Sequence, residues 1–130
     1  MQDFRKLTVW QKAHELVLVV YHASRGFPRE ELFGLTSQMR RAASSIAANI
    51  AEGCGRTQPE FAHYVQIAFG SASELEYHTL LARDLGYLGA AEFGRCSRDA
   101  EEVKRMLTAL LKRIKLSPPN AQTPQRRSVK

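Results

Sequence analysis

Glu60 and His63 have the spacing of a metal-binding motif. On a helix, residues three positions apart lie on the same face, and Glu-x-x-His supplies two ligands of the carboxylate-bridged di-iron sites in four-helix bundles. Such a site needs two of these motifs and two further glutamates, whereas this chain has one motif. Glu60 also fits the third helical position of a capping box that starts at Thr57. We therefore expect no metal site and no cofactor.

The cysteines and the other histidines do not suggest a catalytic arrangement either. Cys54 follows a helix end at Gly53, where nothing in the sequence supplies the base and the oxyanion hole that a nucleophile needs. His14 and His78 fall on or beside apolar helix stripes, where a structural hydrogen bond is the usual role. Cys96 is expected to be a small core residue. Because phosphate-binding loops and nucleophile elbows are also missing from the sequence, we expect a protein that is not an enzyme.

Basic side chains near the C-terminus could bind a polyanion. Arg105 can pair with Glu101 four residues away, as on an ordinary solvated face, but Lys112 and Lys115 have no acid three or four residues away. Cations also stabilise a helix C-terminus, and this remains an alternative role for them. No aromatic stacking platform accompanies these cations in the sequence, so we expect electrostatic binding with little base specificity. The predicted nucleic-acid-binding residues are Arg105, Lys112, Arg113, Lys115, Arg126 and Arg127.

The overall charge agrees with a polyanionic partner. The 130 residues include 19 Lys and Arg against 13 Asp and Glu, a formal charge of +6, and the pI is about 9.7. Three basic residues and no acid follow Ser117, which leaves 16 basic and 13 acidic residues in the rest of the chain. This main part is therefore mildly basic, and nucleic acid is the natural class of partner.

Cysteine usage and hydropathy predict a soluble, cytoplasmic protein. The two cysteines lack Cys-x-x-Cys spacing, which suits a reducing compartment better than a disulfide framework. No signal peptide is visible, and no apolar run approaches the roughly 20 residues that span a bilayer. We expect no membrane partner.

Apolar residues at spacings of three and four predict helices over most of the chain. The first helix covers about residues 7–25 and has a stripe that includes Trp10, Val17 and Tyr21. The second covers residues 35–56; hydroxyl residues at its start could cap it, and Gly53 and Gly55 suit its C-terminus. The third starts at the capping box and runs to about residue 85, and the fourth covers about residues 90–116.

Short connections between these helices predict that sequential helices are antiparallel neighbours. The expected fold is therefore all-α, an antiparallel up-down-up-down four-helix bundle over residues 1–116. Gly70 lies inside the third helix at a cost of roughly 1 kcal/mol relative to alanine, and we expect a close helix crossing there. Residues 117–130 contain three prolines among polar residues, which predicts a disordered basic tail. The predicted core consists of Trp10, Val17, Met39, Ile46, Ile50, Phe61, Val65, Leu75, Val103, Leu107 and Leu110.

The second helix has two faces that are suited to burial. One face carries an apolar stripe directed at the core, and the opposite face is small and, apart from Arg41, uncharged. A solvated face would carry Lys and Glu instead. Since no further helix of the bundle remains to cover this face, we expect a neighbouring subunit to cover it. The predicted interface residues are Ser37, Arg41, Ser44, Ala48 and Ala51.

Polar side chains near the core of the bundle need partners. Asn49 lies roughly 70° from the apolar stripe of the second helix, and Glu74 precedes the core residue Leu75 in the third. Burying such groups without hydrogen bonds is costly. We predict that Arg40 or Arg41, together with Asn49, Glu52 and Glu74, makes polar contacts within or between subunits, with a ligand site as the alternative.

Several short motifs support this fold by resemblance. They occupy residues 4–7, 9–13, 33–34, 40–53, 70–76 and 85–87. Together they resemble the bacterial four-helix-bundle family first described as proteins encoded in 23S rRNA intervening sequences. The resemblance implies a homopentameric ring. A related protein, the accessory variability determinant of diversity-generating retroelements, has this fold, forms a basic pentamer and binds nucleic acid and a reverse transcriptase.

Two functions follow from these observations. The first is a non-enzymatic oligomeric scaffold that binds RNA or DNA electrostatically, as an accessory factor to a retroelement reverse transcriptase if the resemblance extends that far. The second is a structural or protein-interaction module encoded in a 23S rRNA intervening sequence, without a nucleic-acid role. A neighbouring reverse transcriptase gene would favour the first function, and a location inside a 23S rRNA gene would favour the second.

Overall fold

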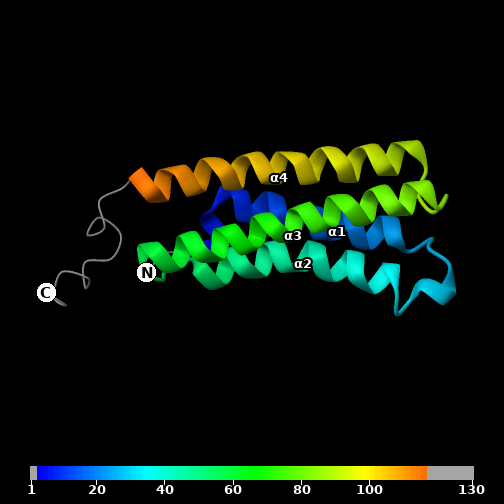
Figure 1. Ribbon diagram of the computed structural model, residues 1–130, viewed down its shortest axis with the longest axis horizontal. Helices are drawn as coiled ribbons and strands as arrows, with labels where there is room; N and C mark the ends of the chain where they lie inside the picture. The colour runs from blue at the N-terminus through cyan, green and yellow to red at the C-terminus, as the bar shows by residue number, and fades with distance from the viewer. Residues whose placement is uncertain (1–2, 117–130) are drawn as a thin grey trace, which may run out of the picture.

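The computed structural model describes residues 3–116, and within this range the protein is all-α, without a strand. Its four long helices lie side by side along the long axis of the molecule (Figure 1). They are α1 (Thr8–Ser24), α2 (Leu35–Gly53), α3 (Gln58–Asp84) and α4 (Ala90–Leu116); the short 3-10 helices η1 (Phe4–Lys6) and η2 (Arg29–Glu31) precede α1 and α2. The prediction of an all-α chain with four helices is confirmed. The predicted tail at residues 117–130 lies outside the described residues.

Each long helix packs against two others. α1 and α3 both contact α2 and α4. The stripes predicted for α2, α3 and α4 face the interior, and their residues are buried. In the described range, no helix is both long and apolar enough to cross a membrane.

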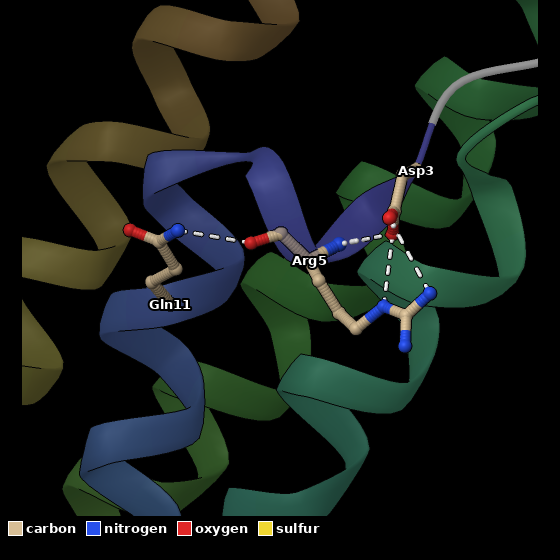
Figure 2. Close-up of polar contacts among 3 residues, drawn as sticks. All are labelled: Asp3, Arg5 and Gln11. Carbon is tan, nitrogen blue, oxygen red and sulfur yellow. Dashed lines mark hydrogen bonds and ion pairs between the residues drawn. The ribbon is translucent and has the colours of Figure 1, made fainter.

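The N-terminal turn is fastened to α1 by polar contacts (Figure 2). The Asp3 carboxylate accepts hydrogen bonds from the backbone N–H and the Nε of Arg5, both at 3.0 Å. Because the charged carboxylate is favoured by these bonds, the pKa of Asp3 is lowered. Gln11 Nε2 donates to the backbone oxygen of Arg5 at 2.9 Å. These contacts hold η1, and with it Lys6, beside the bundle.

The core face of α1 differs from the predicted one. Its buried residues are Val9, Ala13, Leu16, Val20, Ala23 and Ser24. Trp10 and Val17 pack only at the margin of the core, and Tyr21 is exposed. The predicted stripe was therefore wrong by one residue, about 100° of helix rotation. Five apolar residues in a row, 16–20, leave the period ambiguous there, and small Ala13 allows closer packing than the Trp10 ring.

The N-terminus of α2 also differs from the prediction, whereas its C-terminus agrees with it. No side chain of α2 caps its N-terminus; Gly34 is the N-cap residue, and Glu31 Oε1 accepts a hydrogen bond from the N–H of Leu35 at 3.1 Å. Thr36, a hydroxyl residue expected to cap, is buried instead. At the other end the prediction is confirmed: the helix ends at Gly53, and the chain turns at Gly55, whose φ is 90°. Such a φ is accessible to glycine at little cost.

The capping box of α3 is confirmed, but the expected role of Gly70 is wrong. Thr57 Oγ1 accepts from the N–H of Glu60 at 3.4 Å, and Glu60 Oε1 accepts from the N–H of Thr57 at 3.2 Å. A Cβ added at Gly70 would meet no atom within 4 Å, because this position faces outward. The close helix approach lies at Gly53, where a Cβ would lie 2.6 Å from Tyr64 Cβ.

Candidate functional site

The predicted interface residues lie along the outer side of α2. Arg41, Ser44 and Ala48 are exposed, and Ser37 and Ala51 are half-buried. Beside them is a groove of about 460 Å³, which we call the α2–α3 groove. Its lining consists of Gln38, Arg41, Ala42, Ser44, Ser45, Ala48 and Glu74. Three of the five predicted residues therefore line one hollow, together with a carboxylate from α3.

Of the predicted polar residues, Arg40 connects α2 to α1, and Asn49 bonds within α2. Arg40 Nε donates to Ser24 Oγ at 2.8 Å, and its guanidinium lies 4.6 Å from the centre of the Tyr21 ring. These contacts tie α2 to α1. Asn49 Nδ2 donates to the backbone oxygen of Ser45 at 2.8 Å.

The other two polar residues have partners on their own helix or just beyond its end. Glu52 pairs with Arg56, and Glu74 Oε2 lies 3.3 Å from Nε2 of the buried His78. The four residues thus have separate partners inside one subunit. Glu74 alone among them lines the α2–α3 groove.

The predicted nucleic-acid-binding residues on α4 divide between two hollows. Arg105 and Lys112 line a groove of about 770 Å³ between α3 and α4, which we call the α3–α4 groove. Arg113 lines a hollow of about 310 Å³ on the other side of α4, together with Lys6. Ala109 lines both hollows, so they adjoin across α4. Lys115 is exposed, and Arg126 and Arg127 lie outside the described residues.

The cations of this region differ in how firmly they are held. Arg105 Nη1 lies 3.9 Å from Glu101 Oε1, as predicted, but both side chains are about two-thirds exposed, so this pair is weak. Lys104 Nζ is 2.8 Å from Glu76 Oε1 in a less exposed pair. Lys112 and Lys115 make no ion pair with any residue in the range 3–116. Their charge is therefore available to a partner.

Sequence reasoning missed an aromatic residue among these cations. Phe69 of α3 lines the α3–α4 groove and is 37% exposed, with Lys104 Nζ 4.9 Å from its ring centre. The expectation of cations without an aromatic neighbour is therefore wrong. Phe69 precedes Lys104 by 35 positions, and only the packing of α3 against α4 brings the two together.

A second missed feature is the outer face of α3. Ile67, Tyr77 and Leu80 are 38%, 58% and 39% exposed on this face, beside the open Gly70. A helix that is apolar on its outer side as well as its core side is typical of one that is covered on both sides. The sequence carried this signal, since 67–73 and 77–82 have no charged residue.

The thiols and histidines form no reactive centre in the described range. Burial raises the pKa of Cys96 to about 11 and also raises that of Cys54, so both are neutral thiols at pH 7. Residues 3–116 contain no cluster of three His, Cys, Asp or Glu side chains able to hold a metal ion. His14 is exposed rather than placed in the core, and His78 is buried beside Glu74.

The fold and the two grooves define a small all-α protein whose outer surfaces differ in charge. A family model described as 23S rRNA-intervening sequence protein matches residues 5–109, and the chain belongs to this family. The resemblance to the family of 23S rRNA intervening-sequence proteins, inferred from its motifs, is thereby confirmed.

A solved structure supports the fold. It is the crystal structure of a protein with unknown function from the S23 ribosomal protein family of Bacteroides thetaiotaomicron, which is 24% identical to this chain. The match covers 80% of this chain and 95% of that chain, with a TM-score of 0.73. No curated protein matches the chain.

Proposed function

We propose that this protein is a non-enzymatic, cytoplasmic scaffold that self-associates and binds RNA or DNA through the C-terminal half of α4. The observation that carries the proposal is the pair Lys112 and Lys115, exposed and without an ion-pair partner in residues 3–116. Arg105 and Arg113 flank them in adjoining hollows. Cations of this kind bind phosphates and release counterions from nucleic acid.

The scaffold that we propose is an up-down-up-down bundle. Contacts between successive helices support it because they run in opposite order: Gly53 approaches Tyr64, while Ser45, earlier in α2, bonds to Ser71, later in α3. Between α3 and α4, Gln58 bonds to Ile114, whereas Glu76 pairs with Lys104. The colour gradient in Figure 1, which reverses from each helix to the next, agrees with this order.

Self-association into a ring of five is the second part of the proposal. It is supported by the small, mostly uncharged outer side of α2 and by the apolar outer face of α3, which have no cover in one subunit. The number five rests on the family resemblance. A ring would present several copies of the basic half of α4 together, so that weak contacts combine into a multivalent site.

A narrower form of the proposal adds a reverse transcriptase as a protein partner. Its support is the resemblance to retroelement accessory proteins, and a reverse transcriptase gene with a template repeat beside this gene would add to it. The second candidate function is a structural or protein-interaction module. The exposed apolar residues Ile67, Tyr77 and Leu80 favour this candidate, because such a face suits a protein partner.

A salt titration of RNA binding tests the proposed function. The affinity of the unmodified protein should fall steeply between about 50 and 200 mM salt. Replacing Lys112, Arg113 and Lys115 together by Gln should lower the slope of log K against log salt by about 2 to 3. The matched control is the triple Gln variant of Arg25, Arg29 and Arg98, which removes the same charge from exposed positions elsewhere.

The two triple variants separate a local site from general basicity. If both triple variants lower the salt dependence equally, binding depends on the net charge of the protein and not on a local site at Lys112, Arg113 and Lys115. If the unmodified protein binds neither RNA nor DNA at about 50 mM salt, the protein-interaction function becomes the better one.

A further inference from the structure

We infer that the α3–α4 groove is a binding site for single-stranded nucleic acid, in which an unpaired base stacks on Phe69 while the adjoining phosphates contact Arg105 and Lys112. The inference rests on the proposed function and narrows its ligand to unpaired RNA or DNA. It assigns a role to the aromatic residue that lies among the cations.

The groove has the size and lining that a nucleotide requires. Its volume of about 770 Å³ falls in the range of small-ligand sites, roughly 300 to 1,000 Å³. Phe69 reaches into it from α3, and 37% of its surface is accessible. Thr108 of α4 also lines the groove and carries a hydroxyl that can bond to a base edge or a sugar.

The charges of the groove favour phosphate despite its two acids. Glu76 is paired with Lys104 at 2.8 Å, so its charge is largely compensated. Glu101 lies 3.9 Å from Arg105 in an exposed and weak pair. A phosphate can compete for this guanidinium because arginine binds phosphate oxygens in a bidentate manner. Lys112 is exposed and adds a second cation on the same side of α4.

The position of Phe69 selects unpaired bases. In a duplex the faces of the bases are stacked on one another, so a ring inside a groove between two helices has no base face to contact. A single strand can turn a base out of its stack, and aromatic residues beside cations are the usual recognition elements for it. Lys104 Nζ lies over the ring, 4.9 Å from its centre. A stacking base displaces it from the ring face, and it keeps its ion pair with Glu76.

Fluorescence anisotropy with labelled oligonucleotides of about 12 nucleotides tests the inference. The probes are mixed-sequence single-stranded RNA, single-stranded DNA and the corresponding duplexes. Phe69→Ala and Phe69→Leu should each weaken single-strand binding about tenfold, the effect of losing one stacked base. Phe69→Tyr should remain within about twofold of the unmodified protein, since it keeps the aromatic face. Duplex binding should change little in any variant.

Tyr77→Ala is the matched control, because Tyr77 is an exposed aromatic residue of the same helix that does not line the groove. It should leave single-strand binding unchanged. Phe69→Leu keeps the apolar volume, so this variant tests stacking even if Phe69→Ala unfolds the protein, and circular dichroism verifies its folding.

The outcomes distinguish the inference from the proposed function. If Phe69→Leu is folded and binds single strands as tightly as the unmodified protein, while the Lys112, Arg113 and Lys115 variant has lost binding, the inference is overturned and the proposed function stands. An equal loss in Tyr77→Ala and Phe69→Leu would overturn the inference too. If the unmodified protein binds no probe at about 50 mM salt, both fail.

Discussion

The two grooves beside α3 share this helix, but their linings differ in side-chain size and in charge. The α2–α3 groove is lined mainly by small and uncharged side chains from α2, whereas the α3–α4 groove has three cations and two acids. The contrast originates in α2 and α4: α2 carries three charged residues in 19, and α4 carries eleven in 27. The two sides of one helix are therefore suited to different partners.

Desolvation explains why these partners should differ in kind. Small uncharged residues such as Ser44 and Ala48 can be covered by another protein surface at low cost, because no charge has to leave water. Lys112 and Arg105 resist such burial, but phosphate replaces water around them and releases its own counterions. We expect protein contacts on the α2 side and nucleic acid on the α4 side.

The largest expected effect is the loss of folding, which would remove both grooves at once. Leu107 of α4 is fully buried in the core that supports them. Leu107→Asp should prevent folding, because an unpaired buried charge costs several kcal/mol out of a total stability of about 5 to 15. Thermal melting followed by circular dichroism measures this, with Leu116→Asp as the control at an 82% exposed position. A soluble Leu107→Asp protein that melts cooperatively would contradict the core assignment.

The second-largest expected effect should distinguish the α2 side of the molecule from its α4 side. Ala48→Glu places a charge in the α2–α3 groove and should dissociate the assembly while helical content stays the same, because Ala48 is exposed within one subunit. Light scattering at micromolar concentration measures the change, and Ala90→Glu, at an exposed helix start, is the control. Nucleic-acid binding should weaken only through lost multivalency. A monomeric unmodified protein would exclude the predicted interface.

The buried face of most helices could be predicted from the sequence, because residues three and four positions apart on a helix share one face. The stripes on α2, α3 and α4 alternate by three and four with little ambiguity, and all their residues are buried. On α1 a continuous apolar run hid the register, and Trp10 suggested the wrong face. Bulk and hydrophobicity do not by themselves determine which side of a wide apolar band faces the core.

The sites were less predictable because they combine residues from different helices. Arg105 and Lys112 share a groove since they are seven residues apart on one helix, which the helical period can indicate. Phe69 joins them, and Lys6 joins Arg113, only through packing between elements. The period of a helix defines its faces, but it does not say which residue of another helix stands opposite.

A smaller effect concerns the close approach of α2 to α3 at Gly53. Gly53→Ala should lower the free energy of unfolding by about 1 to 3 kcal/mol, the usual range for overpacking. The added Cβ would lie 2.6 Å from Tyr64 Cβ and 3.1 Å from Phe61 Cδ1, which forces the two helices apart. Urea unfolding measures the loss. Stability equal to that of the unmodified protein would show that this contact relaxes freely.

The smallest effect has the opposite sign and lies on the outer face of α3, between the two grooves. Gly70→Ala should raise the free energy of unfolding by roughly 0.5 to 1 kcal/mol, because alanine restricts the unfolded chain and favours a helix interior. No atom within 4 Å opposes the new methyl group in one subunit. Urea unfolding at several protein concentrations measures the effect. At low concentration, where the subunits are separate, the full gain in stability should be seen. If a second copy packs against Ile67 and Tyr77, the gain should shrink as the concentration rises, because the added methyl group then weakens the association of subunits. A loss of stability even at the lowest concentration would contradict the open surroundings of Gly70.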